Sequence, residues 1–200
     1  MIHKWKKFNE MLIKKQPFNN FGSTKTVYLS NTNPNYMFKT FSLHYPYIIR
    51  SEELFGKHNP DLFAKIYKVN YKKGVIIQER LDIGKVKKEF DILTKFFIQK
   101  NFFGKYDSNY PYDLTMNFLR KIVKGNLPVF NFIKIKTPSL EEVNELISKN
   151  IEVKEIFDRW INILTKISKI PEYYYGNHYI DTNWKNFGYD KEGNLKMFDI

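Results

Sequence analysis

The sequence lacks cysteine altogether, which excludes disulfide bonds and any chemistry that depends on a thiolate. It also lacks a long apolar stretch, and no segment approaches the roughly 20 apolar residues of a membrane-spanning helix. The N-terminal segment is basic but has no unbroken apolar run, so it does not predict a secretory signal peptide. Together these three absences predict a cytoplasmic protein that makes no contact with a membrane.

Acidic residues are comparatively few, because 21 aspartates and glutamates stand against 33 lysines and arginines, for a formal net charge of +12. Such an excess favours anionic partners, namely a nucleotide, an acidic protein or a nucleic acid. The lysines are scattered in small groups, which a solvated basic surface would explain as well. The chain has no internal repeat and no low-complexity linker, and 200 residues suit one domain with one or two lobes.

The first third of the chain has the residue pattern of an antiparallel sheet with two short helices. One helix is expected over residues 3–16, ended by Pro17, and another over residues 51–56, with Ser51 as its N-cap. Runs of β-branched and aromatic residues separated by turn residues predict four strands. These strands are expected at residues 26–29, 36–41, 62–69 and 74–80.

The remainder of the chain has the pattern of helices followed by a small hairpin. Apolar residues recur at helical spacing from Lys85 onward, and Ser139 with Glu142 forms a capping-box pattern at the start of a later helix. The sequence therefore predicts an α+β fold, with a hinge between two lobes near residues 79–84. One helix is expected to begin near residue 85, a second to cover 114–123, a third to begin after 139 and a fourth to cover 152–169. Two strands are expected at 186–189 and 195–198.

The predicted hairpin carries three polar residues at a distinctive spacing. Asn186 follows Asp181 by five positions, and Asp199 follows Asn186 by thirteen. This pattern resembles the protein-kinase superfamily, in which a catalytic Asp, an Asn and a metal-binding Asp occur at these spacings. The resemblance implies that Asp181 is the catalytic base and that Lys185 steadies the transferred phosphate. It also implies that Asn186 and Asp199 bind Mg²⁺. Taken singly, each acidic or amide residue suits a turn equally well.

The chemistry of phosphoryl transfer explains why these residue types are needed. The reaction requires a carboxylate that orients the attacking hydroxyl and accepts its proton, together with oxygen ligands that hold Mg²⁺ against the phosphates. The resemblance therefore implies ATP and Mg²⁺ as the cofactors.

Residues 20–27 occupy the place of the family's glycine-rich loop, although Gly22 alone of its glycines is retained. By the resemblance, the backbone N–H groups around Gly22, Ser23 and Thr24 would contact the phosphates. Val27, on the strand that follows, would pack against the adenine.

Lys39 on the next predicted strand matches the lysine that contacts the α- and β-phosphates in that family. Apolar neighbours surround this lysine in the sequence, so an inward ammonium group needs a counter-charge. Glu53 in the short predicted helix is the expected partner, and Glu52 is the adjacent alternative.

Residues 75–81 resemble the family's fifth strand and the hinge that follows it. By this alignment Gln78 is the gatekeeper residue of the adenine pocket. The backbone of Glu79 and Leu81 would bind the edge of the adenine.

Several positions depart from the family pattern. Tyr179 stands where a histidine is usual, and Asn183 stands where a lysine is common in serine and threonine kinases. No activation segment follows Ile200, so we expect either a truncated chain or a minimal kinase. In size the chain is similar to compact kinases of bacterial effectors or phages, for which the host cytoplasm is the expected location.

The leading interpretation is a two-lobed, kinase-like phosphotransferase that transfers the γ-phosphate of ATP to a serine, threonine or tyrosine hydroxyl of a protein. The expected parts are an N-terminal helix over residues 1–17, a nucleotide-binding sheet over 18–81 and a shortened helical lobe over 82–200. The alternatives are a pseudokinase that serves as an interaction module and a small-molecule kinase of the aminoglycoside-phosphotransferase type. A basic nucleic-acid-binding domain is a further alternative.

Overall fold

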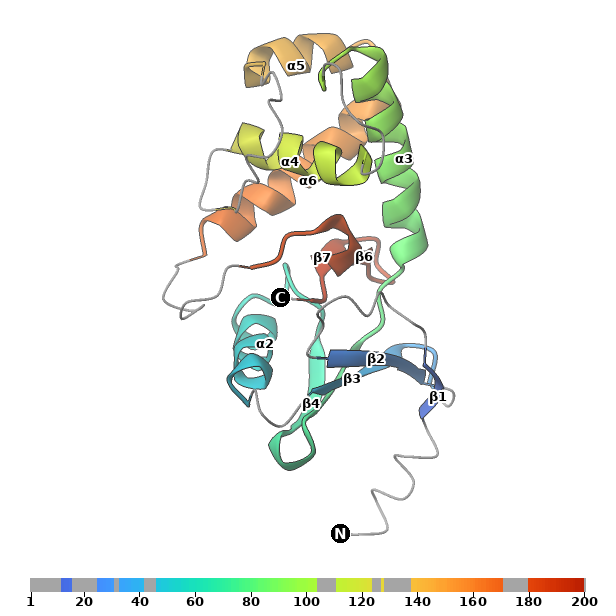
Figure 1. Cartoon of the computed structure of the whole chain (residues 1–200), viewed down its shortest axis with the longest axis vertical. Helices are drawn as coiled ribbons and strands as arrows, with labels where there is room; N and C mark the ends of the chain where they lie inside the picture. Colours follow the sequence, from blue (N-terminus) through green and yellow to red (C-terminus); the bar gives the residue numbers. More distant parts are fainter. Residues whose placement is uncertain are drawn as a thin grey trace. The chain divides into compact units, whose positions relative to one another are not determined.

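The computed structural model describes residues 12–15, 25–30, 33–41, 46–103, 111–123, 127, 138–170 and 180–199 of the chain. The chain divides into two compact units, residues 1–81 and residues 82–200 (Figure 1). The division falls within the segment for which the sequence predicts a hinge. The predicted α+β class is confirmed, because strands dominate the first unit and helices dominate the second.

The first unit contains a five-stranded antiparallel sheet with the strand order β1-β2-β3-β5-β4. Strand β3 therefore lies at the centre of the sheet, between β2 and β5. The strands predicted at 26–29, 36–41 and 74–80 are confirmed to within one residue at each end. The strands are β1 (Leu12–Lys15), β2 (Lys25–Ser30), β3 (Tyr36–Phe41), β4 (Ile66–Asn70) and β5 (Val75–Glu79).

The helix predicted over residues 3–16 is wrong over the four of its residues that the structure describes. Residues 12–15 form strand β1, which pairs antiparallel with β2 so that Leu12 lies opposite Ser30. Pairing with the exposed edge of β2 gives this backbone hydrogen-bond partners, and this outweighs a short amphipathic spacing. The other residues of the predicted helix lie outside the described part of the chain.

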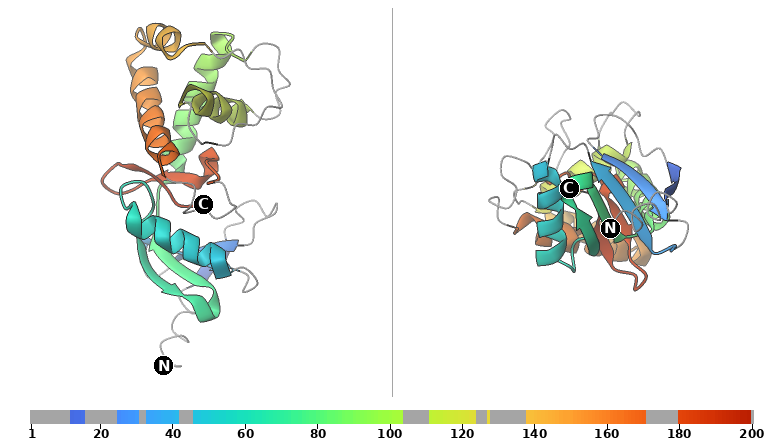
Figure 2. Two further views of the ribbon diagram at one scale, coloured as in Figure 1. Left: turned by 90° about the vertical axis from the view of Figure 1, so that its left-hand side faces the viewer. Right: turned by 90° about the horizontal axis from the view of Figure 1, so that it is seen from below.

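One helix of the first unit, α2 (Pro46–His58), packs against the sheet. It begins five residues before the predicted helix, so Ser51 lies inside it and the prediction of Ser51 as N-cap is wrong. Ile49 and Phe55 on its buried face are almost fully inaccessible to solvent. Figure 2 shows α2 beside β4, and the approach is close, since a Cβ atom at Gly56 would lie 2.9 Å from the Ile66 side chain.

Strand β4 is shorter than predicted, because the chain turns at Asn59 before the strand begins. The backbone N–H groups of Leu62 and Phe63 both donate to the Asn59 carbonyl oxygen, so the predicted strand start at residue 62 is wrong. At the far end of β4 a short 3₁₀ turn, η1 (Tyr71–Lys73), leads into β5. Gly74 closes this turn at a φ of 59°, a left-handed conformation that favours glycine.

Helices dominate the described residues of the second unit, and α3, α5 and α6 each begin directly after a capping residue. Asp82 caps α3 (Ile83–Gln99) through its side chain, and Asn150 does the same for α6 (Ile151–Ser168). The predicted capping box of Ser139 and Glu142 is confirmed at the start of α5 (Leu140–Ile147). Helix α4 (Pro111–Val123) packs against α3 and α6. No helix within the described ranges is long and apolar enough to cross a membrane.

Two short antiparallel strands complete the second unit, β6 (Phe187–Tyr189) and β7 (Leu195–Met197), and the predicted hairpin is confirmed to within one residue. Its turn is held by Asp190, which accepts hydrogen bonds from the backbone and side chain of Asn194. Residue 189 also pairs with Asp82 through two backbone hydrogen bonds, of 2.8 and 3.0 Å. The hairpin is therefore joined to the segment that leads into α3.

Candidate functional site

Lys39 and Glu52 form a buried ion pair in the first unit. Lys39 lies on the central strand β3 and is fully buried, and its Nζ atom lies 2.6 Å from Oε2 of Glu52 on α2. A buried ammonium group is strongly unfavourable unless an opposite charge and hydrogen bonds compensate it. The structure therefore meets the requirement for a counter-charge that the sequence predicted for Lys39.

The expected partner Glu53 is wrong, and the adjacent alternative, Glu52, makes the contact. Glu52 lies three positions from both Ile49 and Phe55 and shares their buried face of α2, whereas Glu53 is turned about 100° away. Glu53 instead pairs with Lys57, one turn later, through Oε1 at 2.6 Å. It also accepts a hydrogen bond from the Tyr71 hydroxyl group.

The other predicted nucleotide contacts in the first unit lie on or beside the same sheet. Val27 on β2 is buried and lies directly opposite Lys39 in the register of the two strands. Gln78 on β5 is buried as well. The backbone N–H of Glu79 donates to the Lys65 carbonyl oxygen at 2.8 Å. The remaining predicted residues are Leu81, which is buried, and Gly22, Ser23 and Thr24, which lie outside the described residues.

In the second unit, a run of short-range hydrogen bonds shapes the loop that begins at Asp181. The Asn183 backbone N–H donates to Asp181 Oδ1 at 3.1 Å, and the Lys185 N–H donates to Asn183 Oδ1 at 3.1 Å. Asn183 thereby caps a 3₁₀ turn, η3 (Trp184–Asn186). The Asn186 side chain then reaches back and donates through Nδ2 to the Asp181 carbonyl oxygen at 2.7 Å. These bonds fix the loop while the Asp181 carboxylate remains exposed.

Asn186 and Asp199 flank the same end of the β6–β7 hairpin. The Phe198 backbone N–H donates to the Asn186 carbonyl oxygen at 2.8 Å, so Asn186 lies opposite the residue that precedes Asp199. The Asn186 amide nitrogen is engaged by Asp181, which leaves Oδ1 as its remaining polar atom. Asp199, which is half-buried, follows Phe198 at this end of the hairpin, and amide and carboxylate oxygens are ligands that suit a hard cation such as Mg²⁺.

Aromatic side chains hold the η3 turn against the helices. The Trp184 ring stacks on Phe90 of α3, with centroids 5.7 Å apart, and meets the Tyr112 ring of α4 edge-on at 5.0 Å. Lys185 is exposed, and its Nζ lies 5.7 Å from the centre of the Trp184 ring. The basic group predicted to steady a phosphate is therefore carried by an anchored turn.

Arg120 is a residue of this region that the sequence analysis missed. It is buried on α4, and its Nε–H donates to Thr182 Oγ1 at 2.8 Å, directly after Asp181. Burial lowers the pKa of Arg120 below its ordinary value, while the negative charges of Asp181 and Asp113 oppose this decrease. One signal was present, since Arg120 follows the apolar Met116 by four positions and so shares its helix face. A charged residue on an apolar face requires a buried partner.

Comparisons with known proteins give little that bears on this site. No protein-family model and no curated protein matches the sequence. Among solved structures, the chain is similar to the choline kinase LicA from Streptococcus pneumoniae, with a TM-score of 0.36 and 15% sequence identity. That likeness covers 99% of this chain, which spans 66% of the length of that protein.

Proposed function

We propose that this chain is a kinase-like phosphotransferase, which transfers the γ-phosphate of ATP to a hydroxyl group with the help of Mg²⁺. One observation carries the proposal above the others. Asn186 is hydrogen-bonded to the backbone of Asp181 on one side and to the residue before Asp199 on the other. These bonds connect three residues that are spread over 19 positions of the sequence, which supports the proposal because phosphoryl transfer needs a carboxylate base and oxygen ligands for Mg²⁺.

The buried pair of Lys39 and Glu52 supports the same function from the first unit. A strand lysine with a helical glutamate as its partner is the arrangement that orients nucleotide phosphates in protein kinases. We assign Lys39 to the α- and β-phosphates, with Glu52 rather than Glu53 holding its side chain in place.

We assign the remaining nucleotide contacts to the sheet and the segment after it. Val27 lies opposite Lys39 and provides an apolar surface for the adenine. Because the Glu79 N–H already donates to Lys65, a contact of Glu79 with the adenine falls to its carbonyl oxygen. Backbone groups of Leu81, and of Gly22, Ser23 and Thr24, complete the proposed nucleotide site.

In the proposed reaction, Asp181 orients the acceptor hydroxyl and takes its proton at Oδ2, since Oδ1 is engaged by the Asn183 N–H. The hydroxyl oxygen forms a bond to the γ-phosphorus, and the bond from that phosphorus to the β,γ-bridging oxygen breaks, releasing ADP. Lys185 stabilises the charge of the transferred group. Asn186 and Asp199 would hold Mg²⁺, which neutralises charge on the phosphate oxygens.

The acceptor that we propose is a hydroxyl group on a protein. The net charge of +12 favours an acidic partner surface. A small-molecule alcohol is the alternative acceptor, and a scaffold that binds nucleotide without transfer is the alternative outcome for the whole site.

The test is transfer of labelled phosphate from ATP, with Mg²⁺, to an acidic protein mixture and to a panel of small alcohols. Wild type is compared with Asp181→Asn and Asp199→Asn, and with Asp61→Asn, which changes an exposed aspartate in a turn of the first unit. We expect transfer by wild type and by Asp61→Asn, and a loss of at least about 100-fold in Asp181→Asn, in line with the contribution of a positioned base.

Three other results would each exclude one part of the proposal. If ATP and Mg²⁺ raise the melting temperature of wild type but no label is transferred, the chain binds nucleotide without catalysis. If label passes only to the alcohols, the acceptor assignment is wrong. Full transfer by Asp199→Asn would exclude that residue as a metal ligand.

A further inference from the structure

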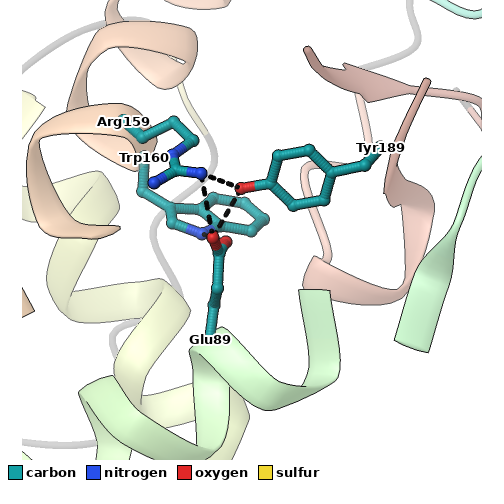
Figure 3. Close-up of polar contacts among 4 residues, drawn as sticks. All are labelled: Glu89, Arg159, Trp160 and Tyr189. Carbon is teal, nitrogen blue, oxygen red and sulfur yellow. Dashed lines mark hydrogen bonds and ion pairs between the residues drawn. The ribbon is translucent and has the colours of Figure 1, made fainter. Parts of the chain in front are cut away.

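Glu89 is a buried carboxylate that lies outside the proposed catalytic residues and is contacted by three donors. It lies on α3 and is 5% exposed. Its Oε1 accepts a hydrogen bond from the Tyr189 hydroxyl at 2.6 Å, and its Oε2 accepts one from Trp160 Nε1 at 3.0 Å. Nη1 of Arg159 lies 3.3 Å from Oε1. Figure 3 shows the side chains of α6 and β6 converging on this carboxylate.

The arrangement is unusual because burying a carboxylate is costly unless its hydrogen bonds are met. Here the partners come from two distant segments, α6 and β6, which lie 71 and 100 positions from Glu89 along the chain. Burial and the hydrogen bond to Glu89 raise the pKa of Tyr189, so its hydroxyl remains a donor across the physiological range. The carboxylate therefore acts as a common acceptor for otherwise separate elements.

Two of these contacts lead to strand β6. Tyr189 is the last residue of the strand, and its backbone pairs with Asp82 next to the start of α3. Trp160, which donates to Glu89, also packs against the ring of Phe187, the first residue of the strand, at 5.0 Å. Glu89 thus holds one end of β6 directly and the other end through Trp160.

The position of β6 in turn fixes the proposed metal ligands. Asn186 directly precedes Phe187, and its carbonyl oxygen accepts the Phe198 N–H, so Asp199 follows the opposing strand at the same end. A metal site depends on the residues that orient its ligands as well as on the ligands themselves. A small shift of β6 would therefore move both ligands together.

We propose that Glu89 is a positioning residue for the β6–β7 hairpin, and that through Tyr189 and Trp160 it sets the affinity of Asn186 and Asp199 for a divalent cation. The metal part of this inference rests on the proposed function. The hairpin part does not, because it concerns only contacts within the second unit.

The first measurement is the affinity of the full chain for Mn²⁺ in the presence of a non-hydrolysable ATP analogue. Water proton relaxation detects the bound Mn²⁺. The variants are Glu89→Gln, Tyr189→Phe and their combination, with Glu155→Gln as the matched control on an exposed site of α6. We expect Glu89→Gln and Tyr189→Phe each to weaken Mn²⁺ binding about tenfold, as is typical when a residue behind a metal ligand is lost.

The double variant tests whether Glu89 influences Mn²⁺ binding through Tyr189. If Glu89 acts through Tyr189, the combination weakens Mn²⁺ binding by less than the product of the two single effects. Independent, multiplicative effects would overturn the assigned route through Tyr189. Unchanged Mn²⁺ affinity in Glu89→Gln would overturn the control of metal binding by Glu89.

The second measurement is amide hydrogen exchange, which needs neither metal nor nucleotide. In Glu89→Gln we expect faster exchange at the amides of Phe198 and Tyr189, which bond within and beside the hairpin. The amides of β5 in the first unit serve as the internal reference, and their exchange should not change. Equal exchange at Phe198 in wild type and both single variants would overturn the hairpin role.

The two measurements also separate this inference from the proposed function. If wild type binds no Mn²⁺ while Glu89→Gln still accelerates exchange at Phe198, the proposed function and the metal part fail and the hairpin part is supported. If wild type binds Mn²⁺ but the Glu89 variants change neither binding nor exchange, the proposed function is unaffected and the positioning role is rejected.

Discussion

Arg120 and Thr182 form a hydrogen bond of 2.8 Å between helix α4 and the loop that carries Asp181, and both residues are buried. The bond joins two segments that lie 62 positions apart in the sequence. Because a guanidinium group seldom enters a protein interior without partners, this contact ties the position of the loop to the position of α4.

We expect Thr182→Val to destabilise the protein by about 1–3 kcal/mol, because it removes an acceptor from a buried charged donor. Thr182→Ser keeps the hydroxyl group and should retain most of the stability. Urea unfolding followed by circular dichroism measures both variants against wild type. An equal loss in the two variants would mean that the Thr182 methyl group, rather than its hydroxyl, carries the effect.

The ion pair of the first unit offers a direct comparison between neighbouring glutamates. Glu52→Gln leaves a fully buried ammonium group facing a neutral side chain, which should cost about 3–5 kcal/mol. Glu53→Gln alters a pair whose lysine is largely exposed, and the change should stay within about 1 kcal/mol. Thermal unfolding of the two variants measures the difference, and similar losses would contradict the assignment of Glu52.

The ionisation of Tyr112 gives a prediction for alkaline pH. A hydrogen bond from its hydroxyl to Asp91, together with burial, raises the pKa of Tyr112 to about 12. Because the folded-state pKa is higher than the ordinary value of about 10, the neutral form is favoured in the folded state. The stabilisation is fully present below about pH 10 and is lost as the pH rises through about 12.

The pKa of Tyr112 can be followed in the protein labelled with ¹³C at the tyrosine Cζ atoms. One resonance should titrate near pH 12 in wild type and be missing in Tyr112→Phe, which assigns it. In Asp91→Asn this resonance should move toward the ordinary tyrosine range, because the main cause of the increase is removed. A titration of Tyr112 that does not respond to Asp91→Asn would contradict the role of that hydrogen bond.

Gly193 in the turn between β6 and β7 has a φ of 86°, where side chains other than glycine are strained. No atom lies within 4 Å of the position that a Cβ would occupy, so the cost of a substitution comes from the backbone alone. We expect Gly193→Ala to destabilise the protein by about 1 kcal/mol. Gly193→Asn should cost less, because asparagine tolerates positive φ; the melting temperatures of the two variants measure this order.

The features that the sequence predicted well are those set by local patterns. The capping box of Ser139 and Glu142, the strand around Lys39 and the hairpin after Asn186 all depend on residues a few positions apart. Alternation, helical spacing and turn residues are direct consequences of backbone geometry, so they can be recognised without knowledge of the rest of the chain.

The errors arose where packing or a neighbouring strand decides the outcome. The choice between Glu52 and Glu53 depends on which face of α2 is buried. The sequence alone does not fix the rotation of this helix about its axis. Residues 12–15 joined a sheet edge instead of a helix, since pairing with β2 offers hydrogen bonds that a short isolated helix lacks.

The residues that the sequence analysis did not find act through long-range contacts. Arg120 reaches Thr182, and Glu89 reaches Trp160 and Tyr189, across 62, 71 and 100 positions respectively. A lone sequence contains no local signal that matches such partners to one another. A charged residue on an otherwise apolar helix face indicates that a buried partner exists, but it does not identify that partner.

The distance along the chain between Glu89 and Tyr189 has a consequence for the order of folding. At typical rates of synthesis, residue 189 emerges from the ribosome roughly 5–20 s after residue 89. During that interval the Glu89 carboxylate on α3 has no strand partner. Burying it would therefore be costly, and early collapse of the chain around this face of α3 is disfavoured. Contacts of such long sequence separation also form slowly. The Glu89 carboxylate can therefore gain its strand partner only after the β6–β7 hairpin has been synthesised.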